Sequence, residues 1–388
     1  MRLLFVKSAL AWPRATGHDV YTYQTMRSCS ALGHEVSLAL ATEPKPEALQ
    51  GLDLRALYRF DQPNGAAIWQ EPSTWLQRKF RSFFGVSDQQ LSALAHAAQS
   101  SRADAVIISG LNVLPYFAAV GKATTVWYAA DELAWHHLSQ LKLGDPMFIA
   151  NVRAAAVWLV YERAHRGLID RAWVVSTTER RAMRWLGGMK AVDVVNLGID
   201  GSFFAPGDEP VQPNTAVFWG RLDFGPNIQA LEWFIRDVWT IVRQRVPDAQ
   251  FTVMGFNPSD GVRATTSVPG VTLMGDVPDL RSIARQHAVA VFPFVSGGGT
   301  KNKLLEAAAL GLPILCTPTA TLGLRGDSLP LTVVVEPKAF ADTLVAMWAD
   351  PDRARRGREA RDWVLREHAW EAMARTAVGT LERTRSVA

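Results

Sequence analysis

The residues with the clearest chemical potential lie in one stretch, residues 292–318, which reads FPFVSGGGTKNKLLEAAALGLPILCTP. A buried strand is predicted to end in three glycines, which let a ligand approach the backbone closely, and the helix that follows would present free N–H groups. Lys301 and Lys303 stand in the first helical turn, where the helix dipole disfavours cations. An anionic ligand would account for both lysines.

Glu306 stands in the next turn of the same predicted helix. A carboxylate there could accept hydrogen bonds from hydroxyl groups beside the anion. A phosphate next to a diol describes the pyrophosphate and ribose of a nucleotide. We therefore predict that Gly298, Gly299 and Thr300 bind a nucleoside diphosphate together with the two lysines and Glu306. The alternative is a solvated helix start after a flexible glycine loop.

This stretch differs from two well-known nucleotide-binding loops. The sequence has no Gly-x-x-x-x-Gly-Lys-Ser/Thr pattern, which excludes a Walker A loop. Asn302 stands where the dinucleotide-binding fingerprint needs its third glycine, and the stretch comes late in the chain. The predicted site therefore belongs to neither class.

Alternating strands and helices are predicted to position this stretch. An apolar run at residues 3–6, a helix and a second apolar run at 35–40 form a βαβ opening, which implies a parallel sheet. The rhythm restarts after residues 201–215, whose prolines and glycines indicate a linker. The predicted fold class is α/β, with two Rossmann-like doubly wound domains facing each other across a cleft. The predicted boundaries are 1–200, a linker at 201–215, 216–365, and a tail helix at 366–388.

The chain resembles glycosyltransferase family 4, whose members have the GT-B fold. The family signature reads roughly Gly-x-Gly-Thr-basic-x-Lys-x-Leu-Glu-Ala and then Ala-x-Gly-x-Pro, and this chain has GGGTKNKLLEAAALGLP. The resemblance spans nearly the whole chain and is strongest in residues 215–326. Its other landmarks follow in family order: NLGID (196–200), FWGRLDFGPN (218–227), VTLMGDVPDL (271–280), TATLGLRG (319–326) and Trp370.

The resemblance implies a function and a set of site residues. The chain would transfer a sugar from a nucleotide-diphosphate sugar to an acceptor, with retention of configuration, and without a metal ion or a further cofactor. The acceptor, a saccharide, a lipid-linked saccharide or a small molecule, would bind the first domain, to which the tail helix would cross back. Gly275 and Val277 would line the nucleobase, while Arg221 and Gly17 would approach the donor phosphates. Arg221 could instead be an ordinary surface residue.

Two positions depart from the family pattern. Gly298 stands where the family commonly has a glutamate that contacts the sugar, and Pro226 replaces a lysine that often follows the Gly-Arg pair. Lys303 or Lys301 would then supply the missing positive charge. These departures keep a second class of function open, a non-catalytic nucleotide-sugar-binding protein.

The candidates for proton transfer lie in YAADELAWHHL, after a strand of the first domain. Asp131 and His136, with Glu132 and His137 beside them, could contact the sugar or deprotonate the acceptor. They could also be a helix cap followed by surface residues. An inverting transferase or a sugar-nucleotide epimerase of the same fold is the nearest enzymatic alternative, and an inverting enzyme would need Asp131 or His136 as its base.

Composition and charge narrow the remaining classes. The 388 residues include 41 basic and 37 acidic side chains, a net charge of +4, which is too small to indicate a nucleic-acid-binding protein. Cys29 and Cys316 have no Cys-x-x-Cys spacing, the histidines have no metal-ligand spacing, and Asp350-Pro-Asp352 reads as a helix start, so no metal site is predicted. No apolar run approaches the ~18 residues of a membrane span, and the N-terminal run is too short for a signal peptide. We expect a cytoplasmic protein.

Residues 75–84, WLQRKFRSFF, place Leu76, Phe80, Phe83 and Phe84 on one side of a predicted basic helix. Such a helix could lie on an anionic membrane surface, which would make the protein peripheral at the inner face of the membrane. Core packing of the apolar stripe is the alternative.

Overall fold

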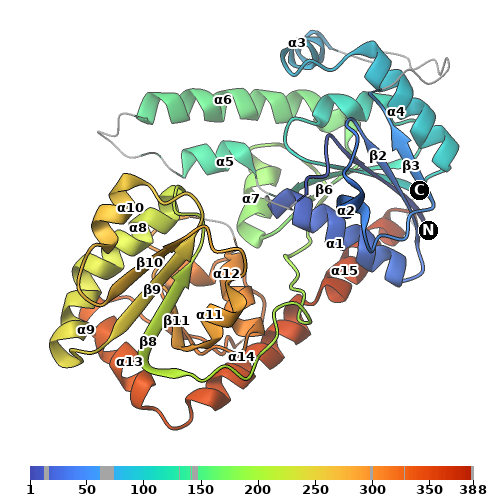
Figure 1. Ribbon diagram of the computed structural model, residues 1–388. Helices are drawn as coiled ribbons and strands as arrows, with labels where there is room; N and C mark the ends of the chain where they lie inside the picture. The colour runs from blue at the N-terminus through green and yellow to red at the C-terminus, as the bar shows by residue number, and fades with distance from the viewer. Residues whose placement is uncertain are drawn as a thin grey trace. The chain divides into compact units, whose positions relative to one another are not determined.

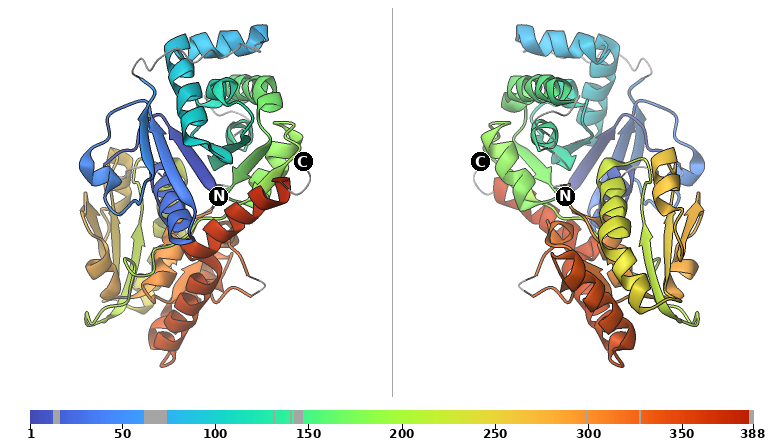
Figure 2. Two further views of the ribbon diagram at one scale, coloured as in Figure 1. Left: turned by 90° about the vertical axis from the view of Figure 1, so that its right-hand side faces the viewer. Right: turned by 90° about the vertical axis from the view of Figure 1, so that its left-hand side faces the viewer.

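The computed structural model describes residues 1–12, 17–61, 74–130, 132–139, 141, 147–297, 300–326 and 328–385. The chain divides into two compact units. Unit 1 comprises Met1–Gly198 and Trp370–Ala388, and unit 2 comprises Ile199–Ala369. Each unit is built on one parallel sheet flanked by helices (Figure 1, Figure 2).

The sheet of unit 1 has seven strands among the described residues, in the order β3-β2-β1-β4-β5-β6-β7. The strands are β1 (Arg2–Lys7), β2 (Glu35–Leu40), β3 (Ala56–Arg59), β4 (Ala105–Ser109), β5 (Thr124–Ala130), β6 (Arg171–Val174) and β7 (Val192–Val194). The α-helices are α1 (Gly17–Ala31), α2 (Pro46–Leu49), α3 (Trp75–Phe83), α4 (Asp88–Ser101), α5 (Leu133–Leu138), α6 (Phe148–His165), α7 (Thr177–Trp185) and α15 (Trp370–Arg385).

The sheet of unit 2 has six strands among the described residues, in the order β10-β9-β8-β11-β12-β13. The strands are β8 (Gln212–Trp219), β9 (Gln250–Gly255), β10 (Val271–Gly275), β11 (His287–Phe292), β12 (Ile314–Cys316) and β13 (Thr332–Val333). The α-helices are α8 (Gly225–Trp233), α9 (Thr240–Arg245), α10 (Asp260–Thr266), α11 (Arg281–Arg285), α12 (Asn302–Ala309), α13 (Pro337–Ala349) and α14 (Arg353–His368). A π-helical turn (Phe234–Trp239) joins α8 to α9.

Both sheets share one topology. The first strand of each unit lies between the second and the fourth, so the chain reverses its direction of winding between β1 and β4 and again between β8 and β11. Strands β4 and β11, next to the first strand of each sheet, are buried along their whole length, as expected where helices cover both faces of a parallel sheet. The predicted α/β class with two doubly wound units is confirmed.

The segment predicted as a linker, residues 201–215, lies in unit 2. Its last residues, from Gln212, already form β8. The part before β8 is held by Arg361 of α14, whose guanidinium donates to the carbonyl oxygens of Phe204 (3.0 Å) and Gly201 (3.1 Å).

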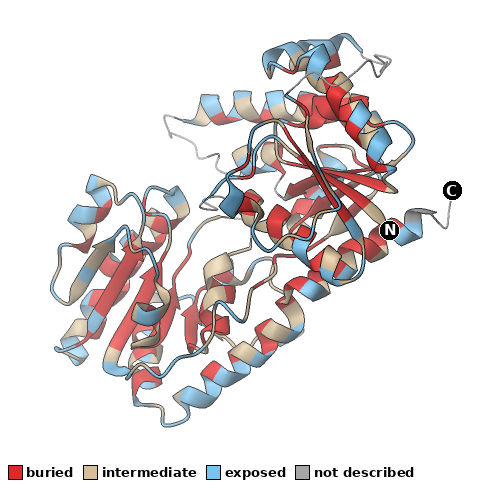
Figure 3. Ribbon diagram, turned by 45° about the vertical axis from the view of Figure 1, so that its right-hand side comes forward, coloured by how far each residue is buried: buried red, intermediate tan, exposed pale blue. Residues whose placement is uncertain are grey.

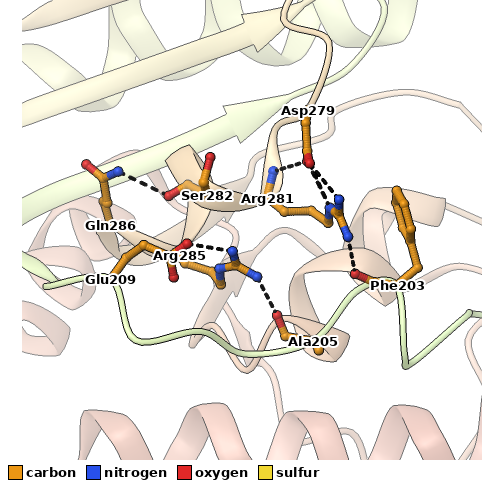
Figure 4. Close-up of polar contacts among 8 residues, drawn as sticks. All are labelled: Phe203, Ala205, Glu209, Asp279, Arg281, Ser282, Arg285 and Gln286. Atoms are coloured by element: carbon orange, nitrogen blue, oxygen red, sulfur yellow. Dashed lines mark hydrogen bonds and ion pairs between the residues drawn. The ribbon is translucent and has the colours of Figure 1, made fainter.

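Two arginines of α11 hold the same segment (Figure 4). Arg281 donates to the carbonyl oxygen of Phe203 (2.8 Å), and its guanidinium carbon lies 3.8 Å from the centre of the Phe203 ring. Arg285 donates to the carbonyl oxygen of Ala205 (2.9 Å) and to Glu209 (2.5 Å). The prolines and glycines thus correctly indicated a segment without regular structure before β8. Arginines of α11 and α14 nevertheless bind its backbone at several positions.

The tail returns to unit 1 at Trp370, four residues later than the predicted boundary at 366. Helix α14 ends at His368, and α15 begins at Trp370. The Trp370 ring lies 6.1 Å from the ring of Tyr21, and α15 packs against α1 (Figure 2). A side chain at Gly198 would collide with the Trp370 ring, so the backbone of Gly198 passes close to this tryptophan.

Two further observations concern sequence predictions. None of the helices in the described part of the chain has the length and apolar character needed to cross a bilayer. Cys29 and Cys316 are buried free thiols, one in each unit.

Candidate functional site

The chain reverses its direction of winding between β8 and β11, and this position is the switch point of unit 2. Two loops meet there. Strands β8 and β11 are neighbours in the sheet, and the chain leaves their carboxyl ends at Trp219 and Phe292. The loop after β11 leads to α12, which carries the lysines and the glutamate of the predicted nucleotide site. In open α/β sheets, ligands bind beyond the carboxyl ends of strands at such a point.

Lys303 is held in a fixed position at this edge. Its ammonium donates to the Oδ1 atom of Asn227 (2.9 Å) and lies 4.9 Å from the ring centre of Phe294 and 5.8 Å from that of Phe218. Burial lowers the pKa of Lys303 to about 8; nearby Glu306 opposes this shift, whereas Lys301 adds to it. An anion would restore the electrostatic stabilisation that this ammonium loses through burial.

Gly220, directly after β8, makes room for this arrangement. A Cβ atom there would lie 2.8 Å from the Nδ2 atom of Asn227 and 3.0 Å from the ammonium nitrogen of Lys303. The Nδ2 group of Asn227 also donates to the carbonyl oxygen of Arg221 (2.6 Å). Asn227 therefore connects the loop after β8 to the lysine of α12.

Glu306 is held by a residue that the sequence did not single out. The indole N–H of Trp219 donates to its Oε2 atom (2.7 Å). Burial raises the pKa of Glu306, while the bond from Trp219 and the charge of Lys303 oppose that shift. One carboxylate oxygen is thus fixed by the indole, and the carboxylate has a second oxygen with which to accept a ligand hydroxyl.

The residues before α12 complete this edge. The ammonium of Lys301 donates to the carbonyl oxygen of Gly297 (2.9 Å), and the Thr300 hydroxyl donates to the carbonyl oxygen of Gly323 (3.4 Å). Among the described residues, no side chain caps the first turn of α12 at Lys301. Gly298 and Gly299 lie outside the described residues.

Three more predicted donor residues lie on the same edge of the sheet. Arg221 is exposed and forms a two-pronged ion pair with Asp223 (3.0 and 2.8 Å), which raises the pKa of the arginine. Gly275 ends β10, two strands away from β8, and half-buried Val277 follows it. The backbone of Arg221 is joined to Lys303 through Asn227, which donates to the Arg221 carbonyl oxygen and accepts from the Lys303 ammonium.

The corresponding switch point of unit 1 carries different side chains. Gly17, predicted to approach the donor phosphates, is the first residue of α1. In the same helix, Asp19 forms an ion pair with Lys7 of β1 (3.0 Å), and the hydroxyls of Thr22 and Ser109 are 2.7 Å apart.

The predicted catalytic residues lie elsewhere in unit 1, after β5. Asp131 is outside the described residues. His136 lies on the surface of α5, where partial desolvation and the neighbouring His137 lower its pKa. A lowered pKa leaves the imidazole neutral at pH 7, which is the form that can accept a proton.

Sequence reasoning missed a cluster of three buried glutamates beside these residues. Glu132, Glu162 and Glu179 come from three different segments, and each is at least nine-tenths buried. The carboxylate of Glu179 accepts a hydrogen bond from the backbone N–H of Glu132 (2.7 Å), and that of Glu132 accepts one from the N–H of Trp135. Glu132 thereby caps α5, as the sequence allowed.

The pKa of Glu162 is raised well above the usual range, first by burial and then by the charge and side chain of neighbouring Glu132. A raised pKa favours the protonated, neutral form of this carboxyl group. No periodicity or motif could have revealed this contact, because α6 contributes Glu162 from a helix that otherwise shows no clear polar face.

No group of three or more histidines, cysteines, aspartates or glutamates within the described ranges is arranged to hold a metal ion.

The architecture has clear counterparts among solved structures. Anabaena Alr3699/HepE, in a complex with UDP and glucose, is 12% identical, with a TM-score of 0.65 over 98% of this chain and 99% of that one. Sucrose-phosphate synthase from Thermosynechococcus elongatus is 17% identical, with a TM-score of 0.66 over the whole of both chains. The pneumococcal O-GlcNAc transferase GtfA, in a complex with UDP and GlcNAc, is 9% identical, with a TM-score of 0.64 over 98% of each chain. The chain therefore has the GT-B fold, as the resemblance implied.

Residues 213–350, which lie within unit 2, match the family model described as Glycosyl transferases group 1. This range includes all the donor-site residues predicted in unit 2, from Arg221 to Glu306. No curated protein matches the chain.

Proposed function

We propose that the protein is a glycosyltransferase whose donor is a nucleotide-diphosphate sugar bound at the switch point of unit 2. The Lys303–Asn227 and Glu306–Trp219 contacts carry this proposal, because they fix a desolvated cation and a carboxylate one helical turn apart at the edge where such folds bind ligands. The family match over residues 213–350 supports the same assignment.

Each side chain has a defined task in this proposal. During transfer, the bond between the anomeric carbon and the diphosphate breaks, and negative charge develops on the leaving group. Lys303, Lys301 and the N–H groups at the start of α12 stabilise that charge. Glu306 accepts hydrogen bonds from the ribose hydroxyls, and Trp219 keeps its carboxylate oriented. Transfer is therefore expected to persist in excess chelator.

The stereochemistry of transfer, the remaining donor contacts and the acceptor are assigned from the resemblance to glycosyltransferase family 4. It favours a retaining enzyme in which a donor phosphate oxygen helps to remove the acceptor proton. Gly275 and Val277 would contact the nucleobase, Arg221 and Gly17 the phosphates, and an acceptor saccharide, lipid-linked saccharide or small molecule would bind unit 1.

Three other functions are outcomes of the test. An inverting transferase would depend on Asp131 or His136 as its base, so the loss of the residue that serves as the base would abolish turnover. An epimerase would change the configuration of the sugar without an acceptor. A non-catalytic binding protein would bind the donor and never release the sugar.

A thermal-shift panel of nucleoside diphosphates and nucleotide sugars identifies the donor, because a ligand that binds the folded state raises the melting temperature by mass action. The best donor is then incubated with and without acceptors, and both the product and the released nucleoside diphosphate are quantified. The proposal expects nucleotide-dependent stabilisation and turnover. Stabilisation without sugar release from any donor would contradict catalysis, and the absence of any stabilising nucleotide would contradict the site.

A further inference from the structure

Helix α6 of unit 1 buries three polar side chains and exposes several aliphatic ones, although it also buries Tyr161 and exposes Arg153 and Arg163. Asn151, Glu162 and His165 are buried, while aliphatic side chains at four positions along the helix are exposed. Figure 3 colours the ribbon by burial, with exposed residues in pale blue. Surface helices normally show the opposite pattern. Ile149 is 71% exposed, and the other exposed aliphatic residues are Val152, Val157 and Val160.

Helix α3 extends this apolar surface. Phe80 and Phe84, predicted as part of one stripe, pack against Tyr161 of α6, each at 4.9 Å between ring centres. Trp75 and Phe83 instead remain 63% and 75% exposed. The stripe predicted for residues 75–84 is therefore divided, because one part anchors the helix to α6 and the other part faces outward.

The end of α7 borders the same surface. Helix α3 lies along one side of α6, where Gln77 donates to the carbonyl oxygen of Ala164 (2.8 Å). On the other side, Arg163 of α6 donates to the carbonyl oxygen of Leu186, directly after α7 (2.8 Å). Trp185, the last residue of α7, is 86% exposed. Helices α3, α6 and α7 thus contribute exposed aromatic and aliphatic groups to one region of unit 1.

The charged residues of these three helices have one sign at the surface. Their acidic residues, Glu162 and Glu179, are both buried. Their basic residues are all exposed or partly exposed; they are Arg78, Lys79, Arg81, Arg153, Arg163, Arg180, Arg181 and Arg184. Lys79 lies over the ring of Trp75, with its ammonium 5.7 Å from the ring centre. Arg81 is paired with Asp88 of α4, and the other basic side chains leave the region both apolar and positively charged.

We propose that this surface of α3, α6 and α7 docks on a lipid bilayer that contains anionic headgroups. Tryptophan and phenylalanine side chains insert favourably at a membrane interface, and arginine and lysine pair with anionic headgroups while their stems lie along the apolar region. A second copy of the chain fits this surface less well, because a two-fold contact would place the same cations against one another. The inference does not depend on the proposed function.

The test uses the purified full-length chain in a vesicle flotation assay. One set of vesicles contains phosphatidylcholine alone, and the other contains three parts phosphatidylcholine to one part phosphatidylglycerol. We expect flotation with the anionic vesicles to exceed that with neutral ones by at least about tenfold in apparent affinity, and to fall as salt is raised. Equal binding to both vesicle types would overturn the role of charge.

Paired variants test the surface itself. Trp75→Ser with Phe83→Ser removes apolar contacts, and Lys79→Glu with Arg153→Glu reverses two charges. Each pair should weaken binding to anionic vesicles by at least about tenfold. The matched controls are Val335→Ser and Arg358→Glu, exposed residues of unit 2, which should bind as the unaltered protein does.

Circular dichroism and melting temperature establish that each variant is folded, and Trp185→Ser provides an independent substitution that does not touch α3. Wild-type vesicle binding by all the folded surface variants would overturn the proposal. A concentration-dependent dimer that the same substitutions dissociate, without vesicle binding, would also overturn it, because the occupant would then be a second copy.

Discussion

The two switch points of the molecule share a strand order but differ in how their lysines are compensated. In unit 1, Lys7 at the end of β1 forms a 3.0 Å ion pair with Asp19, and both side chains are largely buried. In unit 2, Lys303 donates to the neutral amide oxygen of Asn227 and lies over two aromatic rings. The unit 1 lysine is paired directly with a carboxylate, whereas the unit 2 lysine is hydrogen-bonded to a neutral amide and has the charge of Glu306 only nearby.

This difference shows what topology does and does not determine. The winding of each sheet creates an edge where two loops diverge, and that edge is available for a ligand in both units. The chemistry comes from the side chains that later elements bring to the edge. In unit 2, α12 brings Lys303 and Glu306, and β8 and α8 supply the Trp219 and Asn227 that orient them.

A pair of glycine substitutions tests this contrast with the largest expected effect. Gly220→Ala places a methyl group within 3.0 Å of Asn227 and of the Lys303 ammonium, which must then shift, so it should weaken nucleoside-diphosphate binding by at least about tenfold. Gly110→Ala, at the unit 1 switch point, also forces alanine into a positive φ (132°) and places the methyl 3.1 Å from Val113. It should lower the melting temperature without changing nucleotide affinity.

Isothermal titration calorimetry with the donor nucleotide measures both variants. Equal losses of affinity in Gly220→Ala and Gly110→Ala would show that general destabilisation, and not the position of Lys303, controls binding.

Trp219→Phe tests whether the indole N–H of Trp219 orients Glu306 for nucleotide binding in unit 2. It keeps an aromatic ring but removes the N–H that holds Glu306, so the affinity for nucleosides and their diphosphates should fall about fivefold, or ~1 kcal/mol. Trp239→Phe is the matched control, because its indole donates to the carbonyl oxygen of Pro269 (3.1 Å) in the same unit. A similar loss of nucleotide affinity in the control would refute a specific role for Trp219.

Glu162→Gln tests the buried carboxyl cluster of unit 1 and has the smallest expected effect. The folded-state pKa of Glu162 is raised, so its contribution to stability is full below the unfolded pKa and is lost as pH rises through the folded value. Glutamine mimics the protonated form. The melting temperature should rise by about 2–4 °C at pH 8 and change little at pH 5.

Scanning calorimetry at the two pH values checks this prediction, with Glu232→Gln on the exposed side of α8 as the control. A shift that is equal at pH 5 and pH 8 would show that Glu162 does not hold the proton.

The sequence predicted the donor-binding residues of 292–318 because these residues are close together in the chain. Glycines, lysines and Glu306 fall within one loop and two helical turns, so their spacing alone placed them together. Their partners were not predictable in this way, since Asn227 and Trp219 lie 76 and 87 residues away from the groups that they hold. Only the pairing of β8 with β11 brings them together.

Two other regions show the same limit. The composition of residues 201–215 correctly indicated irregular structure, but it could not reveal that Arg281, Arg285 and Arg361 bind the segment. The amphipathic pattern of residues 75–84 indicated one apolar stripe, but it could not show which side chains α6 covers. In both cases the deciding contacts come from distant elements.

The central claim is that Lys303 contacts the phosphates of the donor and Glu306 its ribose. Calorimetric titration of Lys303→Ala and Glu306→Ala with a nucleoside and its diphosphate tests it most directly, with Lys338→Ala as an exposed control in unit 2. Lys303→Ala should weaken diphosphate binding at least about tenfold and leave nucleoside binding nearly unchanged, whereas Glu306→Ala should weaken both at least about tenfold. Wild-type affinity for both ligands in Glu306→Ala would contradict the account.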